Sequence, residues 1–131
     1  RYGDGLMHVL YWGQGGEQFV EQLFSKLEYP SVPTLLYSDA CIDELRGVLT
    51  TRRTDISLLV LAPASIEQLD ALIAIESVVE GLPLILLLPS EDNAVHTLAH
   101  RLRPRFAAGL ADNLENAAAV AANMIRIQRF G

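Results

Sequence analysis

The chain has 131 residues and a net charge of −6; half of its residues are apolar and a fifth are charged. These values are typical of one globular domain that buries a core, and the acidic balance argues against direct nucleic-acid binding, which needs clustered lysine and arginine. No apolar run approaches the ~18 residues of a membrane span, no signal peptide is recognisable, and a single cysteine excludes an internal disulfide. We therefore expect a cytoplasmic protein without membrane contact.

The first third of the chain alternates β-prone and helical segments. Residues 7–12 predict a strand that ends at the glycine-rich sequence 13–16. Residues 17–28 carry apolar side chains at helical spacing, which predicts an amphipathic helix. A short strand is predicted at 34–37, and the apolar positions from 41 to 49 predict a second helix.

The centre of the chain is the apolar run 55–63, which shows no alternation of polar and apolar residues. Such a run predicts a strand that is covered on both faces, and a second run of this kind lies at 84–88. Between them, Ser65 and Gln68 form a capping-box pattern that opens a helix running to about residue 80. Two doubly buried strands joined by a helix indicate a parallel sheet.

The last third repeats this alternation. Ser90 is predicted to cap a helix over 91–102, and residues 106–110 form a small fifth strand. Asp112 is predicted to begin a last helix that runs to about residue 130. No linker and no internal repeat interrupts the five strands and five helices.

This order predicts an α/β protein of flavodoxin-like (βα)5 type. Parallel crossovers are almost always right-handed, so helices should cover both faces of the sheet. We predict a five-stranded parallel sheet of order 2-1-3-4-5, with a crevice between the ends of the first and third strands. Residues 1–5 are interpreted as an expression leftover, and 6–131 as one domain taken from a longer chain.

Three features carry a family resemblance: Asp55 enters one apolar strand, Leu82-Pro83 enters the next, and a five-residue strand precedes the last helix. Over residues 7–130 the chain resembles a receiver domain of the bacterial two-component response regulators. The resemblance implies phosphoryl transfer from a histidine kinase to an aspartate that ends the third strand. It also implies an acidic pair holding Mg²⁺, a Ser or Thr ending the fourth strand, and a Lys ending the fifth.

Aligned by strand ends, this sequence lacks each of those groups. The family's positions fall on Gly13 and Gln14 (acidic pair), Val60 (phosphoacceptor), Leu88 (hydroxyl) and Gly109 (lysine). The chain's only lysine, Lys26, lies in the first predicted helix. We therefore interpret the chain as a degenerate receiver, or pseudo-receiver, that takes no phosphoryl group and needs no cofactor.

A small anionic ligand is the alternative use of the predicted crevice. The residues that could bind it are Gly13, Gln14, Gly15 and Ser90. A glycine-rich loop before a helix can hold a phosphate on the free N–H groups of the helix N-terminus. The sequence does not match G-x-G-x-x-G, however, and a plain tight turn is the simpler interpretation.

Metal binding has two weak candidates. Asp92, His96 and His100 lie four residues apart on a predicted helix, but zinc would need further ligands and the chain offers no H-E-x-x-H. Four carboxylates that follow strands could bind Mg²⁺ or Ca²⁺ weakly: Asp39, Glu91, Asp92 and Asp112. Each also fits a first helical turn, where a carboxylate offsets free N–H groups. We predict no metal site.

Partner contacts are expected at two places. The last predicted helix is alanine-rich and apolar almost all round, and small residues let a second helix approach closely. The resemblance implies dimer and effector contacts on the face made by the fourth helix, fifth strand and last helix. The expected interface residues are His96, His100, Ala118, Val120, Ala122 and Ile127. Arginines 101, 103 and 105, with 52 and 53, form a basic end that could dock an acidic partner or simply be solvated.

Two functions follow from this reading. The first is a non-catalytic signalling module that acts by docking or dimerisation with a second copy, another signalling protein or an output domain. The alternative is a sensor for a nucleotide-like or flavin-like ligand in the crevice, with Trp12 nearby. An enzyme comes third, because we find no Ser-His-acid arrangement, and Cys41 is placed within a helix face.

Overall fold

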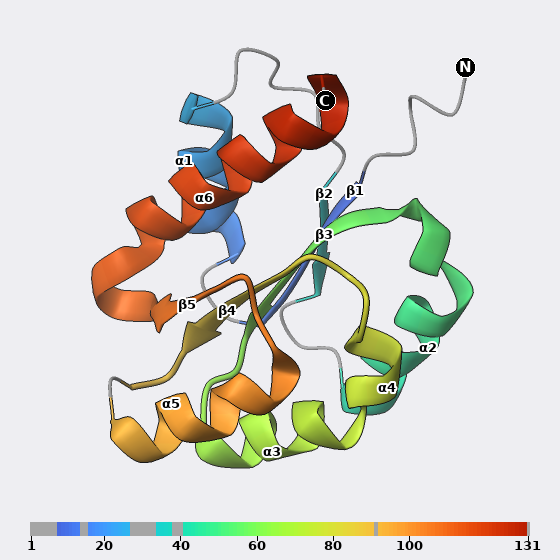
Figure 1. Ribbon diagram of the computed structural model, residues 1–131, viewed down its shortest axis with the longest axis vertical. Helices are drawn as coiled ribbons and strands as arrows, with labels where there is room; N and C mark the ends of the chain where they lie inside the picture. Colours follow the sequence, from blue (N-terminus) through green and yellow to red (C-terminus); the bar gives the residue numbers. More distant parts are fainter. Residues whose placement is uncertain (1–7, 14–15, 27–33, 38–40, 91, 131) are drawn as a thin grey trace.

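The computed structural model describes residues 8–13, 16–26, 34–37, 41–90 and 92–130. Figure 1 shows a twisted β-sheet with helices on both sides. Its strands are β1 (His8–Gly13), β2 (Thr34–Tyr37), β3 (Ile56–Ala62), β4 (Leu84–Leu88) and β5 (Phe106–Gly109). They form a five-stranded sheet of order β2-β1-β3-β4-β5, and each pair of neighbours is parallel. The flavodoxin-like α/β class is confirmed.

Helices cover both faces of this sheet. They are α1 (Gly16–Lys26), α2 (Ile42–Thr51), α3 (Ile66–Ala74), α4 (Glu76–Val79), α5 (Asn93–Ala99) and α6 (Leu110–Phe130). Two short 3₁₀ segments, η2 (Arg53–Asp55) and η3 (His100–Leu102), lead toward β3 and β5. α1 and α6 lie on one face and α2 to α5 on the other, as Figure 1 shows. None of the helices in the described ranges combines the length and hydrophobicity of a membrane span.

Two apolar cores result, one on each face. Along β1, Val9 and Tyr11 belong to the core under α1 and α6, whereas Leu10 and Trp12 belong to the core under α2 to α5. Successive side chains of a strand point to opposite faces, which explains this division. In β4 all five residues are buried, and in β3 only Ser57 is partly exposed. Burial on both faces removes the need for a polar position, so these strands read as unbroken apolar runs.

The predicted helix over 65–80 is divided in the structure. Its start is confirmed, because the Ser65 hydroxyl accepts a hydrogen bond from the Gln68 N–H at 3.2 Å. The prediction of one continuous helix is wrong, because Ile75, at φ −108° and ψ 25°, separates α3 from α4. β-branched residues crowd this region and favour helix less than straight-chain residues do. Ile75 and Val79 are both buried.

The predicted boundaries of the last two helices also need correction. α5 begins at Asn93 with Asp92 as its N-cap, and the Ser90 hydroxyl instead accepts a hydrogen bond from the Asp92 N–H at 3.3 Å. Residues 100–102 form the 3₁₀ turn η3 and not a continuation of α5. α6 starts at Leu110, directly after β5, and not at Asp112. The chain thus passes from strand to helix at Gly109 without a loop.

Candidate functional site

The carboxyl edge of the sheet is where an open parallel sheet binds ligands, at the point where the strand order reverses. Here that point lies between β1 and β3, which end together at the pair Gly13–Ala62. β4 and β5 end at the pair Leu88–Gly109. Gln14 and Gly15, expected to line the same edge, lie outside the described residues.

Gly13 brings the ends of β1 and β3 into close backbone contact. Its φ of +116° is a conformation that L side chains rarely adopt. A Cβ at this position would lie 2.7 Å from the carbonyl carbon of Ala62 and closer still to its oxygen. No residue with a side chain, aspartate included, fits at Gly13 unless the backbone of β3 moves. At this level the main chains of the two strand ends are in close contact.

The third strand ends at Ala62, inside the run 55–63 from which it is predicted. Val60 is paired with Tyr11 and Ile85, two residues before the end of β3. The β3 residue paired with Gly13 is Ala62, so the structure places Ala62 rather than Val60 at the strand end. Both side chains are fully buried. The Ala62-Pro63 sequence closes this run, because proline has no N–H to continue a ladder.

The remaining strand ends carry little polar chemistry. Leu88 is 1% exposed and belongs to the core under α2 to α5. Gly109 is buried, and the exposed Ser90 uses its hydroxyl in the turn before α5. Among the described residues no Ser, Thr, Asn, Gln, His or charged side chain is buried. None of the strand-end residues Gly13, Ala62, Leu88 and Gly109 therefore carries a polar side chain.

Tyr11 shows how apolar the layer beneath this edge is. Its ring packs against Phe19 of α1, with ring centroids 5.2 Å apart and planes inclined by 43°. Burial raises the pKa of the Tyr11 phenol well above its ordinary value, because the phenolate would lose its hydration. Trp12, predicted to lie beside the crevice, is 3% exposed and faces the opposite core.

The predicted metal ligands are not gathered into a site in the described part of the chain. No group of three or more His, Cys, Asp or Glu side chains there is placed to hold a metal ion. Asp92 is exposed at the N-cap of α5, where its backbone carbonyl accepts the His96 N–H at 3.1 Å. Asp39 and Glu91 lie outside the described residues, as does the side chain of Asp112. The Lys26 ammonium lies 3.7 Å from a carboxylate oxygen of Glu115, joining α1 to α6.

The alanines of α6 serve the chain's own core. Ala118 and Ala122 are at most 1% exposed and pack with Phe19 and Leu23 of α1. The prediction that these alanines form a partner interface is therefore wrong. Small side chains do let a second helix approach, but that helix is α1. The outward positions of α6 include Ala119, which is exposed.

Other predicted interface residues lie nearer the surface. His96 on α5 and Val120 on α6 are half-buried, and His100 is exposed at η3. The Ile127 side chain lies outside the described part of the chain. Cys41, expected within a helix face, is instead the exposed N-cap of α2.

The sequence matches no protein-family model and no curated protein. Three solved structures are similar in fold. A pilus assembly-related protein from Burkholderia pseudomallei has a TM-score of 0.64 at 14% identity, over 95% of each chain. The phosphorylated cyanobacterial phytochrome response regulator RcpA has 0.59 at 12%, over 91% of each chain. The signal receiver domain of a modulated diguanylate cyclase from Desulfovibrio desulfuricans has 0.53 at 21%, over 92% of this chain and 97% of that one.

The fold is that of a receiver domain. This assignment confirms the resemblance drawn from the apolar strands and their entrances. Phosphorylation chemistry at the carboxyl edge of the sheet remains an expectation from the sequence resemblance. In this chain that edge is formed by Gly13, Ala62, Leu88 and Gly109.

Proposed function

We propose that the chain is a phosphorylation-independent signalling module, a pseudo-receiver that acts through contacts with proteins. The observation that carries this proposal is the approach of Gly13 to the Ala62 carbonyl group. A receiver needs carboxylates at this point to hold Mg²⁺ beside the phosphoacceptor. Here there is no room for even one of them at Gly13.

The energetic comparison supports the same reading. A phosphoryl group and its metal carry charges that are stable only among carboxylate, hydroxyl and ammonium groups. Ala62 and Leu88 offer none of these groups and are buried. Placing a charge beside them without partners would cost several kcal/mol. The close contact between Gly13 and the Ala62 carbonyl group also disfavours the small-ligand sensor, because it leaves little space between the two strand ends.

The contact surface that we propose is the outward side of α5, β5 and α6. Half-buried and exposed residues there include His96, Phe106, Ala119 and Val120. Ala118 and Ala122 are buried in the chain's own core, so they are not available to a partner. The contact area would therefore be small and would include both polar and apolar residues. Transient signalling contacts have this character. The partner would be a second copy, another signalling protein or an output domain.

A phosphoryl mimic tests whether the chain is independent of phosphorylation. Beryllium fluoride with Mg²⁺ should leave the amide NMR spectrum of this chain unchanged, while a receiver with a complete acidic pair serves as the positive control. Saturable, Mg²⁺-dependent shifts at Leu61, Ala62 or Leu88 would overturn the proposal.

Analytical ultracentrifugation tests whether the chain acts through protein contacts. A concentration-dependent mass is expected for the chain alone if the partner is a second copy. Ala119→Arg on the exposed side of α6 should then weaken association, whereas Thr50→Arg on the exposed side of α2 should not. If both variants behaved alike, the contact would lie elsewhere.

A further inference from the structure

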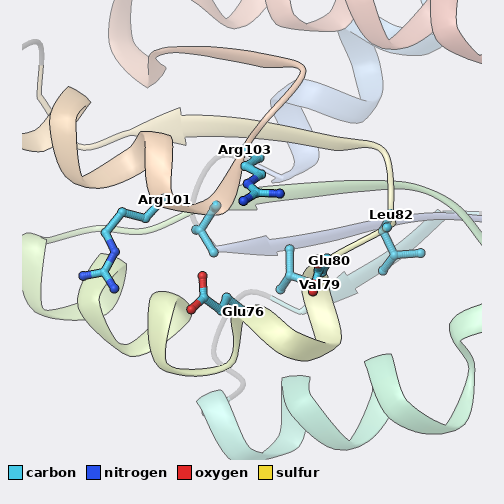
Figure 2. A pocket seen from close by; sticks show the side chains of 8 residues that line it. Glu76, Val79, Glu80, Leu82, Arg101 and Arg103 are labelled. Atoms are coloured by element: carbon cyan, nitrogen blue, oxygen red, sulfur yellow. The ribbon is translucent and has the colours of Figure 1, made fainter.

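A cavity of about 390 Å³ opens at the amino edge of the sheet, opposite the edge described above. Figure 2 shows α4 and its following turn on one side of this cavity and the η3 segment on the other. Its lining residues are Glu76, Val79, Glu80, Gly81, Leu82, Arg101, Leu102 and Arg103. The sequence predicts a basic end of the sheet here, but residues from two separate segments form the cavity.

The two walls carry opposite charge. Glu76 and Glu80 are one helical turn apart on the α4 side, and Arg101 and Arg103 flank Leu102 on the other side (Figure 2). All four charged residues are exposed. Within the described part of the chain none of their side chains takes part in an ion pair, so the opposed charges stay more than 4.0 Å apart.

An apolar floor lies between these walls. Val79 and Leu102 are at most 6% exposed, and Leu82 is half-buried. Pockets that bind small molecules commonly combine an apolar surface with a few convergent charged groups. A ligand that fits must therefore present an anion to one wall, a cation to the other and an apolar group to the floor.

The backbone holds both walls in place. Arg103 ends η3 with φ 52° and ψ 54°, a left-handed conformation that is uncommon for a residue with a side chain. Its N–H donates to the His100 carbonyl oxygen at 3.1 Å, which fixes the turn. On the other wall, the Arg53 guanidinium donates to the carbonyl oxygens of Val78 and Glu80. The pocket is thus preformed, which reduces the entropy lost on binding.

The volume limits the ligand to a small one. A cube of 390 Å³ has an edge of about 7 Å, the span of two extended peptide residues at 3.3–3.6 Å each. We propose that this pocket binds a zwitterion of dipeptide size with an aliphatic side chain. Its carboxylate lies on the wall that carries Arg101 and Arg103, and its ammonium lies on the wall that carries Glu76 and Glu80. The proposal is independent of the proposed function, because the pocket and the carboxyl edge are at opposite ends of the strands.

The test uses glycyl-leucine with the whole chain, followed through the amide NMR signals of Gly81, Leu82 and Leu102. Saturable shifts at these amides are expected. N-acetyl-glycyl-leucine lacks the ammonium and glycyl-leucinamide lacks the carboxylate. Each should bind about two- to fivefold more weakly, the effect of losing an ion pair with exposed side chains.

Variants that remove the charges of one wall test which end of the peptide that wall binds. In the double variant Glu76→Gln with Glu80→Gln, glycyl-leucine should bind no better than its acetylated form. In Arg101→Gln with Arg103→Gln, it should bind no better than its amide. The matched control is Arg105→Gln, an exposed arginine at the same end that does not line the cavity; it should keep the full discrimination.

Two results would overturn the proposal. One is the absence of saturable shifts at these three amides up to the solubility limit of the peptide. The other is equal binding of the free and capped peptides by the unmodified chain. If a double variant fails to fold, the comparison of the three peptides on the unmodified chain decides alone. Neither result bears on the response to beryllium fluoride.

Discussion

Gly13 and Ala62 meet main chain to main chain: a Cβ on Gly13 would stand 2.7 Å from the carbonyl carbon of Ala62. The two residues are register partners at the carboxyl ends of β1 and β3. This pair lies at the point where the strand order of the sheet reverses. Its geometry can be tested without any ligand.

Gly13→Ala is expected to lower the free energy of unfolding by at least about 2 kcal/mol, through backbone strain and overpacking together. The measurement is urea denaturation. Gly47→Ala is the matched control, because Gly47 is exposed in α2 and a Cβ there would meet nothing within 4 Å. That change should stabilise by about 0.5–1 kcal/mol. A Gly13→Ala chain of unchanged stability would contradict the close approach.

Val60→Asp is expected to destabilise the fold by about 3 kcal/mol or more at neutral pH, because Val60 is fully buried. Burial would raise the pKa of the introduced carboxyl above its ordinary value of about 3.9. The loss should therefore be smallest at low pH and grow as the pH rises through that range. Denaturation at several pH values checks this, with Val60→Ala as the pH-independent control. Restoration of stability by Mg²⁺ would count against the pseudo-receiver.

Ala118→Leu is expected to destabilise by about 1–3 kcal/mol, because Ala118 is fully buried in the core shared with α1. Ala119→Leu, one residue further on the exposed side, should change stability by no more than about 0.5 kcal/mol. Thermal denaturation of the two variants compares them directly. Equal stabilities would indicate that α6 packs in a different orientation.

Arg53→Ala is expected to cost about 1–3 kcal/mol, because its guanidinium supplies the hydrogen bonds of the Val78 and Glu80 carbonyl oxygens. Arg52→Ala provides the comparison. Arg52 makes a surface ion pair with Asp55 at 3.6 Å, which is worth about 0–1 kcal/mol. Urea denaturation of both variants should therefore rank Arg53→Ala as the more damaging. The reverse order would show that Arg53 does not hold the end of α4.

The alkaline stability of the chain should depend on Tyr11. Burial raises the pKa of its phenol, so the folded state keeps the phenolic proton more strongly than the unfolded state. The contribution is present below the ordinary tyrosine pKa of about 10 and is lost as the pH rises above it. An ultraviolet titration should show one of the four tyrosines ionising only on unfolding. In Tyr11→Phe that late step should be absent.

The strands were predictable because a strand that is buried on both faces consists almost entirely of apolar residues. The runs at 55–63 and 84–88 contain almost no polar residue, and the structure places β3 and β4 there. The start of α3 was equally readable, since Ser65 and Gln68 act locally. Helix continuity was not readable, because β-branched residues favour helix only slightly less than others and do not by themselves locate the break at Ile75.

The candidate sites were harder to predict than the strands. A glycine at position 13 indicates a turn, but its approach to Ala62 depends on the register of two strands far apart in the chain. An alanine-rich helix indicates close packing without naming the helix that packs, and here it is α1. The cavity between α4 and η3 joins residues from two separate segments. Contacts of this kind arise only when the chain is folded.

Gly13, at the end of β1, also determines which change must come first if this chain is to be engineered into a switch that responds to phosphorylation. Writing carboxylates into the sequence first would fail, since the first of them has no volume to occupy. The spacing between the two strand ends must be widened beforehand, by changes on the β3 side. Geometry has to be redesigned before charge is added.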